Sequence, residues 1–310
     1  MNRIIRIGSR KSKLALIQST MVKELIDVLP GYSSEIVTVD TTGDRILDRS
    51  LPAIGDKGLF TRELEEQLLD GRVDLAVHSL KDLPTSLPPG LRLGAVTRRE
   101  DVRDVFISTR YDSFHDLPED ARIATGSLRR RSQLQRMRPD IAIEDLRGNV
   151  PTRIEKLTRH GYDGIILAAA GVKRLKLEHV IRAYFDIEEM IPAAGQGALG
   201  IEVRDDARDL DPVLQRLHDP DSALETRAER TILHRLQGSC QVPIGVSARL
   251  SGEHIRMAAF VSSFDGSRFI EERRDGAASS ADDLISDLLN ALLSRGAADL
   301  IRDLRDSGGV

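Results

Sequence analysis

Apolar and polar positions in the first part of the chain alternate between strand-like runs and helical periodicities. Residues 3–7 alternate and then break at Gly8-Ser9. Apolar residues at spacings of three and four follow, and they predict a helix over Lys13–Leu29 that Pro30-Gly31 ends. The other elements predicted here are a strand over Ser34–Val39, a helix over about Phe60–Leu69, and a short apolar run over Asp74–Val77 that is typical of a buried parallel strand.

The same order of elements returns further along the chain. It consists of a strand over Arg122–Ala124, a helix over Leu128–Arg138, a strand over Ile141–Asp145, a helix over Thr152–Arg159 and an apolar strand over Gly164–Ala169. Alternating strands and helices predict two α/β domains with largely parallel sheets that face each other across a cleft. Identity between the halves is low, so the repeat indicates similar structures and not a proven duplication.

The pattern changes again towards the end of the chain. The apolar run Leu199–Val203 is predicted to return to the first sheet. A helix over Ala223–Leu236, strands near Val246–Leu250, Ile255–Val261 and Arg268–Arg274, and a helix over Asp282–Leu293 predict a small α+β domain. The expected domains are 1–98 with about 198–217, then 103–192, then 220–310, the last carrying Cys240.

Composition narrows the class of ligand. The chain has 310 residues, 4% aromatic residues, no Trp and a net charge of −4, which argue against nucleobase stacking and general polyanion binding. Many of the 45 basic residues nevertheless sit in short local groups, which favours a small anionic ligand. The single Cys fits a reducing compartment, the N-terminal residues lack an apolar signal core, and no apolar run reaches the ~18 residues of a membrane span. We therefore expect a cytoplasmic protein.

Two predicted turns from strand to helix carry hydroxyl and basic residues, at Ser9–Ser12 and Thr125–Arg131. Free backbone N–H groups at a helix start bind anions, and guanidinium adds two-point carboxylate binding. The alternative is ordinary N-capping with solvated charges. Arg147, Gly148 and Arg153 belong to a third turn, and Lys173-Arg174 follow a strand. The expected cationic lining, which implies a ligand with several carboxylates, comprises Arg10, Arg129, Arg130, Arg147, Arg153 and Arg174.

Two further residues are candidates for chemistry. Asp82 follows the apolar strand beside Lys81, where a carboxylate can stabilise a cation and move protons, or simply form an exposed pair with Lys81. Cys240 lies between Gly238 and Pro243, in a loop where a thiolate can reach an electrophile, although most lone Cys residues are buried and inert. His78 is expected to be structural, and the seven scattered His residues give no metal spacing.

Seven motifs in order along the chain resemble the porphobilinogen deaminase family. They are Ser-Arg-Lys-Ser-Lys-Leu-Ala-Leu-Ile-Gln (9–18), Lys-Gly-Leu-Phe (57–60), His-Ser-Leu-Lys-Asp-Leu-Pro (78–84), Thr-Gly-Ser-Leu-Arg-Arg (125–130), Leu-Arg-Gly-Asn-Val (146–150), Pro-Ala-Ala-Gly-Gln-Gly (192–197) and Gly-Ser-Cys-Gln-Val-Pro-Ile-Gly (238–245). The resemblance covers nearly the whole chain. It implies two domains similar to the halves of periplasmic binding proteins and a third that presents the cysteine.

The resemblance also implies an activity and its residues. It implies a hydroxymethylbilane synthase that polymerises four porphobilinogen molecules stepwise, with loss of ammonia, on a dipyrromethane cofactor joined by a thioether to Cys240. It assigns catalysis to Asp82 and no role to a metal. Cofactor binding falls to Cys240, Lys81, Thr125, Ser127, Arg129, Arg130, Arg147 and Gly148, and substrate binding to Arg10, Ser12, Gln18, Arg147, Arg153, Arg174, Gln196 and Gly197. The implied protein is a monomeric enzyme of tetrapyrrole (haem) biosynthesis, and its product passes to a uroporphyrinogen-III synthase.

Three positions depart from the family's usual pattern. Gly126 stands where a second Ser is frequent, Ser239 where Gly precedes the cysteine, and Lys13 where Pro is frequent. None of them removes a proposed charge or nucleophile.

Two other functions compete with the enzyme: a solute receptor with two lobes and no chemistry, and an arginine-rich nucleic-acid binder. The missing export signal and the Cys240 domain argue against the receptor, and the negative net charge argues against the binder.

Overall fold

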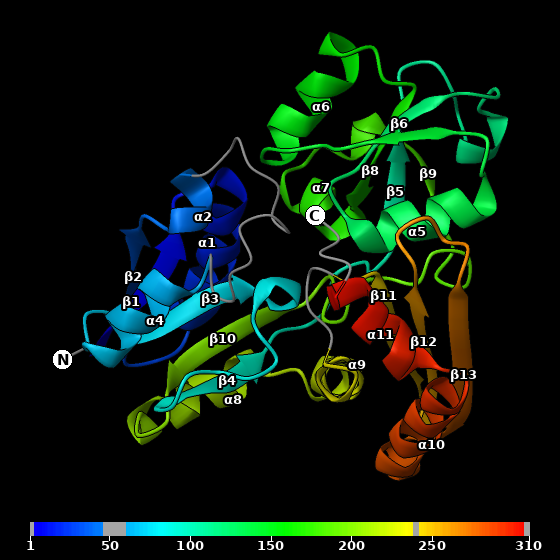
Figure 1. Cartoon of the computed structure of the whole chain (residues 1–310). Helices are drawn as coiled ribbons and strands as arrows, with labels where there is room; N and C mark the ends of the chain where they lie inside the picture. Colours follow the sequence, from blue (N-terminus) through cyan, green and yellow to red (C-terminus); the bar gives the residue numbers. More distant parts are fainter. Residues whose placement is uncertain (1–2, 46–59, 238–241, 307–310) are drawn as a thin grey trace. The chain divides into compact units, whose positions relative to one another are not determined.

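The computed structural model describes residues 3–45, 60–237 and 242–306 (Figure 1). Contacts between these residues divide the chain into two units. The first contains the described residues up to Glu100 together with Gly197–Leu224, and the second contains Asp101–Gln196 and the described residues from Glu225 onward. The second and third predicted domains therefore fall within one unit, and their separation into two domains stays a prediction.

The first unit is built on a five-stranded sheet with the order β2-β1-β3-β10-β4. Its strands are β1 (Arg3–Arg10), β2 (Tyr32–Val39), β3 (Leu75–Ser79), β4 (Leu91–Val96) and β10 (Leu199–Arg204). β1 runs parallel to β2 and β3, whereas β10 pairs antiparallel with both β3 and β4. The predicted return of Leu199–Val203 to the first sheet is thereby confirmed.

Helices cover both faces of this first sheet. They are α1 (Lys13–Asp27), the short α2 (Thr42–Arg45), α4 (Arg62–Leu69) and α8 (Asp211–Leu217), with 3-10 turns η1 (Leu80–Asp82) and η4 (Arg208–Leu210). α1 and α8 pack on one face, where Val22 and Leu214 join the core of β1, β3 and β10. α4 packs on the other face through Leu64 and Leu68. The helix itself is confirmed, but its predicted apolar side is wrong: Met21, Leu25 and Val28 are exposed, and α1 instead buries Val22 and Ile26, which lie one turn apart.

The second unit repeats this topology in a sheet with the order β7-β6-β8-β5-β9. Its strands are β5 (Asp104–Ile107), β6 (Arg122–Ala124), β7 (Ala142–Glu144), β8 (Gly164–Ala168) and β9 (Ile181–Tyr184). β6 is parallel to β7 and β8, and β5 is antiparallel to β8 and β9, so the antiparallel strand again holds the fourth place. The similarity predicted from the two halves of the sequence is thus a similarity of strand order.

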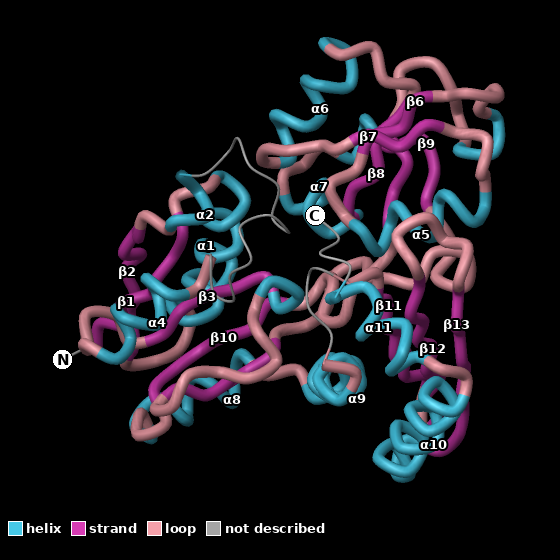
Figure 2. The backbone as a smooth tube through the Cα atoms, in the orientation of Figure 1, coloured by secondary structure: helices cyan, strands magenta, loops and turns pink. Residues whose placement is uncertain are grey.

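Three helices and two 3-10 turns complete this second sheet: α5 (Leu128–Met137), α6 (Val150–Arg159), α7 (Ala169–Arg174), η2 (Phe114–Asp116) and η3 (Glu178–Val180). α6 and α7 cover one face through Leu157 and Val172. α5 covers the other face through Leu134, which packs with Phe106 and Phe114. Figure 2 shows the sheet strands between these helices.

The end of the chain forms a third, antiparallel sheet with the order β11-β12-β13. Its elements are α9 (Pro220–Arg235), which crosses the division between the units, β11 (Ile244–Ser251), β12 (His254–Ser262), β13 (Phe269–Ala277), η5 (Ala278–Ser280), α10 (Ala281–Ser294) and α11 (Ala297–Asp306). Buried Phe260 lies on its central strand, and α10 buries Leu288 and Leu292. The predicted fold class, two α/β sheets and a small α+β part, is confirmed. Sequence patterns missed β4, β5, β9, α7, α8 and α11, most of them too short to show a period.

No helix in the described part of the chain combines the length and the apolar composition that crossing a membrane requires.

We predict that Gly164→Ala destabilises the second unit. A Cβ at Gly164 would lie 2.2 Å from the Phe106 ring, inside a packed sheet. Such overpacking costs about 1–3 kcal/mol. Thermal unfolding of Gly164→Ala measures the effect, and Gly276→Ala is the matched control, because its nearest neighbour is the flexible Leu284 side chain at 3.3 Å. Equal unfolding midpoints for the two variants would contradict the packing described.

Candidate functional site

One edge of the second unit's sheet gathers most of the predicted basic residues. β6, β7 and β8 are parallel, so their carboxyl ends lie at the same edge, and antiparallel β5 begins there because Asp104 pairs with Ala168. The turns after these strands carry Thr125 and Ser127, Arg147 and Gly148, and the start of α7. Ligands of α/β sheets bind at such edges. The predicted residues of this unit are therefore brought together.

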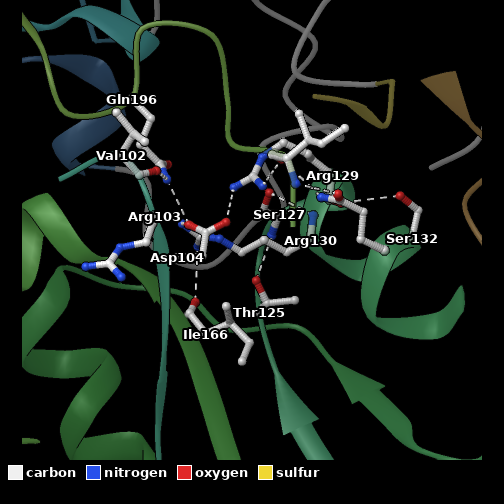
Figure 3. Close-up of polar contacts among 12 residues, drawn as sticks. Val102, Arg103, Asp104, Thr125, Ser127, Arg129, Arg130, Ser132, Ile166 and Gln196 are labelled. Atoms are coloured by element: carbon white, nitrogen blue, oxygen red, sulfur yellow. Dashed lines mark hydrogen bonds and ion pairs between the residues drawn. The ribbon is translucent and has the colours of Figure 1, made fainter. Parts of the chain in front are cut away.

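Asp104 is the centre of this edge (Figure 3). Its Oδ2 accepts a hydrogen bond from Arg129 Nη2 at 2.7 Å, and its Oδ1 accepts one from Arg130 Nη2 at 2.8 Å. Gln196 Nε2 donates to the same Oδ1 at 2.9 Å. Asp104 is fully buried, and both guanidiniums are almost fully buried. One carboxylate thus serves two buried cations.

The cluster carries an excess of positive charge. Burial would raise the pKa of the Asp104 carboxyl, but the charges of Arg129 and Arg130 outweigh burial and hold this pKa far below its ordinary value. Burial and the neighbouring Arg130 lower the pKa of Arg129, while Asp104 raises it. Arginine remains protonated at neutral pH in proteins. The three side chains therefore sum to one net positive charge in a low-dielectric place.

Arg130 has an unused donor in this cluster. Its Nη1 donates to Ile166 O at 3.1 Å and its Nη2 to Asp104, but its buried Nε has no hydrogen-bond acceptor among the described residues. A buried donor without an acceptor is costly, and such groups are rare in folded proteins. An anion reaching this edge would satisfy both the unused donor and the excess charge.

The local sequence explains how α5 presents these arginines. Ser127 caps the helix by accepting from Arg130 N at 3.4 Å, and Thr125 Oγ1 accepts from Ser127 N at 3.4 Å. N-capping is therefore present, as the alternative expected. Solvated charge is wrong for Arg129 and Arg130, because both guanidiniums face inwards.

Arg147 differs from the two buried arginines. Its guanidinium is half-buried, and burial lowers its pKa while Asp145 raises it. Within residues 3–45, 60–237 and 242–306, no hydrogen bond or ion pair holds this guanidinium. A half-buried cation without a partner is typical of a binding group.

The residues around Arg147 are fixed more firmly. Arg153 Nε donates to Gly148 O at 2.6 Å. Gly148 has a φ of 109°, and a Cβ there would meet Thr152 at 2.9 Å, so only glycine suits the turn. Asn149 caps α6 by accepting from Thr152 N at 3.1 Å. Partly exposed Arg174 lies in the last turn of α7.

The first unit has a corresponding edge, where β1 and β3 end. The Arg10 guanidinium lies over the Phe60 ring, 4.1 Å from its centroid, and Ser12 caps α1 by accepting from Ala15 N at 3.3 Å. Gln18, which is buried, donates through Nε2 to Ser79 Oγ at 2.8 Å. The turn η1 then presents an exposed Asp82 and a half-buried Lys81. Both units thus carry predicted residues at the carboxyl edges of their sheets, and the predicted common cleft stays a prediction.

His78 has a structural partner, as expected. Its Nε2 lies 2.9 Å from Glu202 Oε2, and both side chains are buried. In the described part of the chain, no group of three or more His, Cys, Asp or Glu side chains is arranged to hold a metal ion.

Gln196 and Gly197 have different surroundings. Gln196 is buried and donates through Nε2 to Val102 O at 2.7 Å as well as to Asp104. Gly197 has a φ of 92°, and a Cβ there would lie 2.4 Å from Glu100 O. Gly197 is therefore required by close backbone approach, and Gln196 is held by protein groups.

Several predicted positions lie outside the described residues or show a local reason for their identity. Cys240 and Ser239, and Lys57 to Leu59 of the second motif, lie outside the described residues. A Cβ at Gly126 would lie 2.6 Å from Leu146 O, which gives a steric reason for glycine where Ser is frequent. Lys13 is the first residue of α1.

Comparison with known proteins decides the family. The model of the porphobilinogen deaminase dipyrromethane cofactor binding domain matches residues 5–211, and that of the porphobilinogen deaminase C-terminal domain matches residues 223–294. The chain belongs to the porphobilinogen deaminase family. The predicted family, activity, enzyme class and dipyrromethane cofactor are thereby confirmed.

Several porphobilinogen deaminases match this chain almost from end to end. That of Syntrophomonas wolfei is 46% identical over 98% of this chain and 99% of its own, and that of Campylobacter curvus is 48% identical over 97% of each. Among solved structures, the methionine binding protein MetQ aligns with a TM-score of 0.46 at 12% identity, covering 71% of this chain and 91% of its own. A periplasmic substrate-binding protein of an ABC transporter from Coxiella burnetii aligns with a TM-score of 0.45 at 15% identity, covering 71% and 95%.

The residues of this porphobilinogen deaminase family member fit an acidic oligopyrrole. The edge of the second sheet offers an excess positive charge, an unused Arg130 donor and the half-buried Arg147. Guanidinium groups pair with carboxylates through directed hydrogen bonds. The donor set therefore matches the dipyrromethane group that the family model names, whose side chains are carboxylates.

Sequence reasoning missed Asp104 and Gln133. Gln133 Oε1 accepts from Ile191 N at 2.8 Å, and its Nε2 donates to Ile191 O at 3.2 Å. Asp104 opens the apolar run Val105–Ile107, and a charged residue at the start of a buried strand was the available signal. Gln133 gave no signal, because its partner is a backbone group 58 residues away.

We predict that Arg147→Gln weakens substrate binding without destabilising the protein. The change removes a desolvated charge that has no partner in the described residues, so the thermal midpoint should stay equal or rise. The KM for porphobilinogen should rise roughly tenfold, because a charge-assisted contact of about 1.4 kcal/mol is lost.

Arg131→Gln is the control for this change. Arg131 pairs with the exposed Asp145 at 3.0 Å and lies on the same helix as the buried arginines. Its loss should leave KM unchanged, since exposed ion pairs contribute little. An unchanged KM in Arg147→Gln would remove Arg147 from the site.

Proposed function

We propose that this porphobilinogen deaminase family member performs the family's reaction with the residues assigned to it below. It joins four porphobilinogen molecules stepwise to a dipyrromethane held by Cys240 through a thioether, with one ammonia released for each, and water then cleaves the bond to the dipyrromethane and releases hydroxymethylbilane. The single observation that carries this assignment is the arginine cluster around Asp104, with its net positive charge and unused Arg130 donor. Such a site suits a carboxylate brought in by a pyrrole.

The arginine-rich edge binds carboxylates. Each porphobilinogen carries an acetate and a propionate group, so every added ring brings two negative charges. Lys81, Thr125, Ser127, Arg129, Arg130, Arg147 and Gly148 are assigned to the cofactor, and Arg10, Ser12, Arg147, Arg153 and Arg174 to the substrate. Directed guanidinium bonds orient the rings as well as attract them. Gln18, Gln196 and Gly197 are assigned a supporting role on the substrate side, because the amides hold Ser79 and Asp104 and the glycine permits a tight turn.

Asp82 stabilises the positive charge that develops during the reaction. Loss of ammonia from porphobilinogen leaves positive charge on its pyrrole nitrogen, and a fixed carboxylate stabilises that charge as it develops. The exposed position of Asp82 in η1 supports this role, because its carboxylate is accessible to a ligand. The same carboxylate accepts or returns the proton of the pyrrole nitrogen.

Cys240 supplies the attachment. When bound, the dipyrromethane supplies a pyrrole α-carbon as the nucleophile at the growing end. The chain between α9 and β11 holds the cysteine, and covalent attachment keeps intermediates from diffusing away.

Three further properties follow the family and are proposed with it. The protein acts as a monomer in the cytoplasm, and it hands its product to a uroporphyrinogen-III synthase. Two competing functions are a solute receptor without catalytic activity and a nucleic-acid binder. Both are disfavoured, because porphobilinogen deaminases match along 98% of the chain.

We predict that the purified protein carries extra mass equal to two linked pyrroles. Intact mass spectrometry measures this directly. Cys240→Ser is the matched control and should show only the mass of the polypeptide, because a hydroxyl is a far weaker nucleophile than a thiolate. A wild-type protein of unmodified mass, even after incubation with porphobilinogen, would contradict the proposed attachment.

We predict that Asp82→Asn retains the attached pyrroles but loses at least about 99% of its turnover, since removal of one electrostatic stabiliser costs roughly 10²–10³ in kcat. Hydroxymethylbilane formation and intact mass are measured together. Asp70→Asn is the control, because exposed Asp70 lies before the start of β3, at the opposite edge of the sheet. Normal turnover in Asp82→Asn would refute the assigned carboxylate.

A further inference from the structure

Asp104 divides its two oxygens between two arginines (Figure 3). Oδ2 accepts a hydrogen bond from Arg129 Nη2 at 2.7 Å, and Oδ1 accepts one from Arg130 Nη2 at 2.8 Å. Neither guanidinium therefore forms the usual two-point pair with this carboxylate. Each guanidinium is held by a second acceptor on another segment. Arg129 Nη1 donates to Ile191 O at 2.7 Å, and Arg130 Nη1 donates to Ile166 O at 3.1 Å. The planes of both groups are therefore fixed by protein contacts alone.

The carboxylate itself is also fixed. Gln196 Nε2 donates to Asp104 Oδ1 at 2.9 Å and to Val102 O at 2.7 Å. Asp104 therefore has three donors from α5 and from the segment before β10, and it cannot turn towards one arginine without breaking a bond to another. Without its negative charge, two buried guanidiniums would face each other uncompensated, which is strongly unfavourable.

We propose that Asp104 is a positioning residue of the carboxylate site. It acts through Arg129 and Arg130, holding their guanidiniums in one orientation and cancelling one of their two charges, so that the pair offers a single net positive charge to one ligand carboxylate. This inference rests on the proposed function, because the ligand is the acidic oligopyrrole assigned above.

A comparison within the same sheet distinguishes this arrangement from an ordinary structural ion pair. Asp163 lies at the opposite edge, where it accepts from Arg122 N at 2.8 Å and pairs with the exposed Arg110. There, one carboxylate meets one guanidinium that is open to water. Asp104, in contrast, is fully buried with two cations, so its surroundings are balanced only when another anion is present.

A double-mutant cycle on the full-length protein tests the proposal. Asp104→Asn, Arg130→Gln and the double variant are compared for KM and kcat with porphobilinogen, for the fraction carrying the two-pyrrole mass, and for thermal midpoint. Asp163→Asn, alone and with Arg130→Gln, is the matched control. Coupling between residues in contact shows as non-additive effects, whereas distant sites add.

The expected result is strong coupling. Asp104→Asn should raise KM roughly tenfold and lower the fraction carrying the pyrrole mass, with a smaller change in kcat. In the Arg130→Gln background the same change should alter KM by less than about twofold, because the pair of guanidiniums that Asp104 holds in one orientation is already broken. Asp163→Asn should leave KM and the pyrrole mass unchanged in both backgrounds.

Other outcomes overturn the inference in different ways. Normal KM and loading in Asp104→Asn, or effects that add to those of Arg130→Gln, would show that Asp104 does not act through the arginines. If Arg130→Gln itself changes neither KM nor loading, the ligand role proposed for the cluster fails, and the positioning role fails with it. If Asp104→Asn does not fold, the double variant, whose three side chains again carry the wild-type net charge, should recover a midpoint near that of Arg130→Gln, and a double variant that remains unfolded would overturn the proposal.

Discussion

The pairing of one buried carboxylate with two buried guanidiniums is the constraint on which the second unit's site depends. Asp104 comes from β5, Arg129 and Arg130 from α5, and Gln196 from the segment that precedes β10. Burying three charges is expensive unless every one has partners. The sheet, the helix and this segment therefore have to meet in one arrangement. In that arrangement, the two guanidiniums and the one carboxylate sum to one net positive charge.

The two α/β sheets place their candidate binding residues in the same way. In each, four of the five strands run in one direction and end at one edge, and the antiparallel strand occupies the fourth place. Helix starts, turn hydroxyls and arginines then gather at that edge because the chain leaves each parallel strand there. The edges differ in chemistry: the first unit offers an exposed carboxylate at Asp82, and the second offers guanidiniums.

Much of the fold and of the candidate site could be predicted from the sequence. Long periodic segments such as α1 and α10 were predicted within a few residues, since their apolar spacing repeats over several turns. Short strands such as β5 and β9, each of four residues, carry too little pattern to be recognised. Motifs identified Arg129, Arg130 and Arg147 as a group, but they gave no sign that the first two are buried and the third lacks a partner in the described residues.

By itself, the sequence determined the alternation of strands and helices, the family, and the candidate residue types, because these depend on local periodicity and on short motifs. Only the tertiary structure decided which charges neutralise each other. Asp104 and Arg129 are 25 residues apart and Gln196 lies 92 residues from Asp104, yet one carboxylate binds both. Electrostatic energy depends on the distance between charges and on their burial, and the order of residues along the chain does not give either quantity.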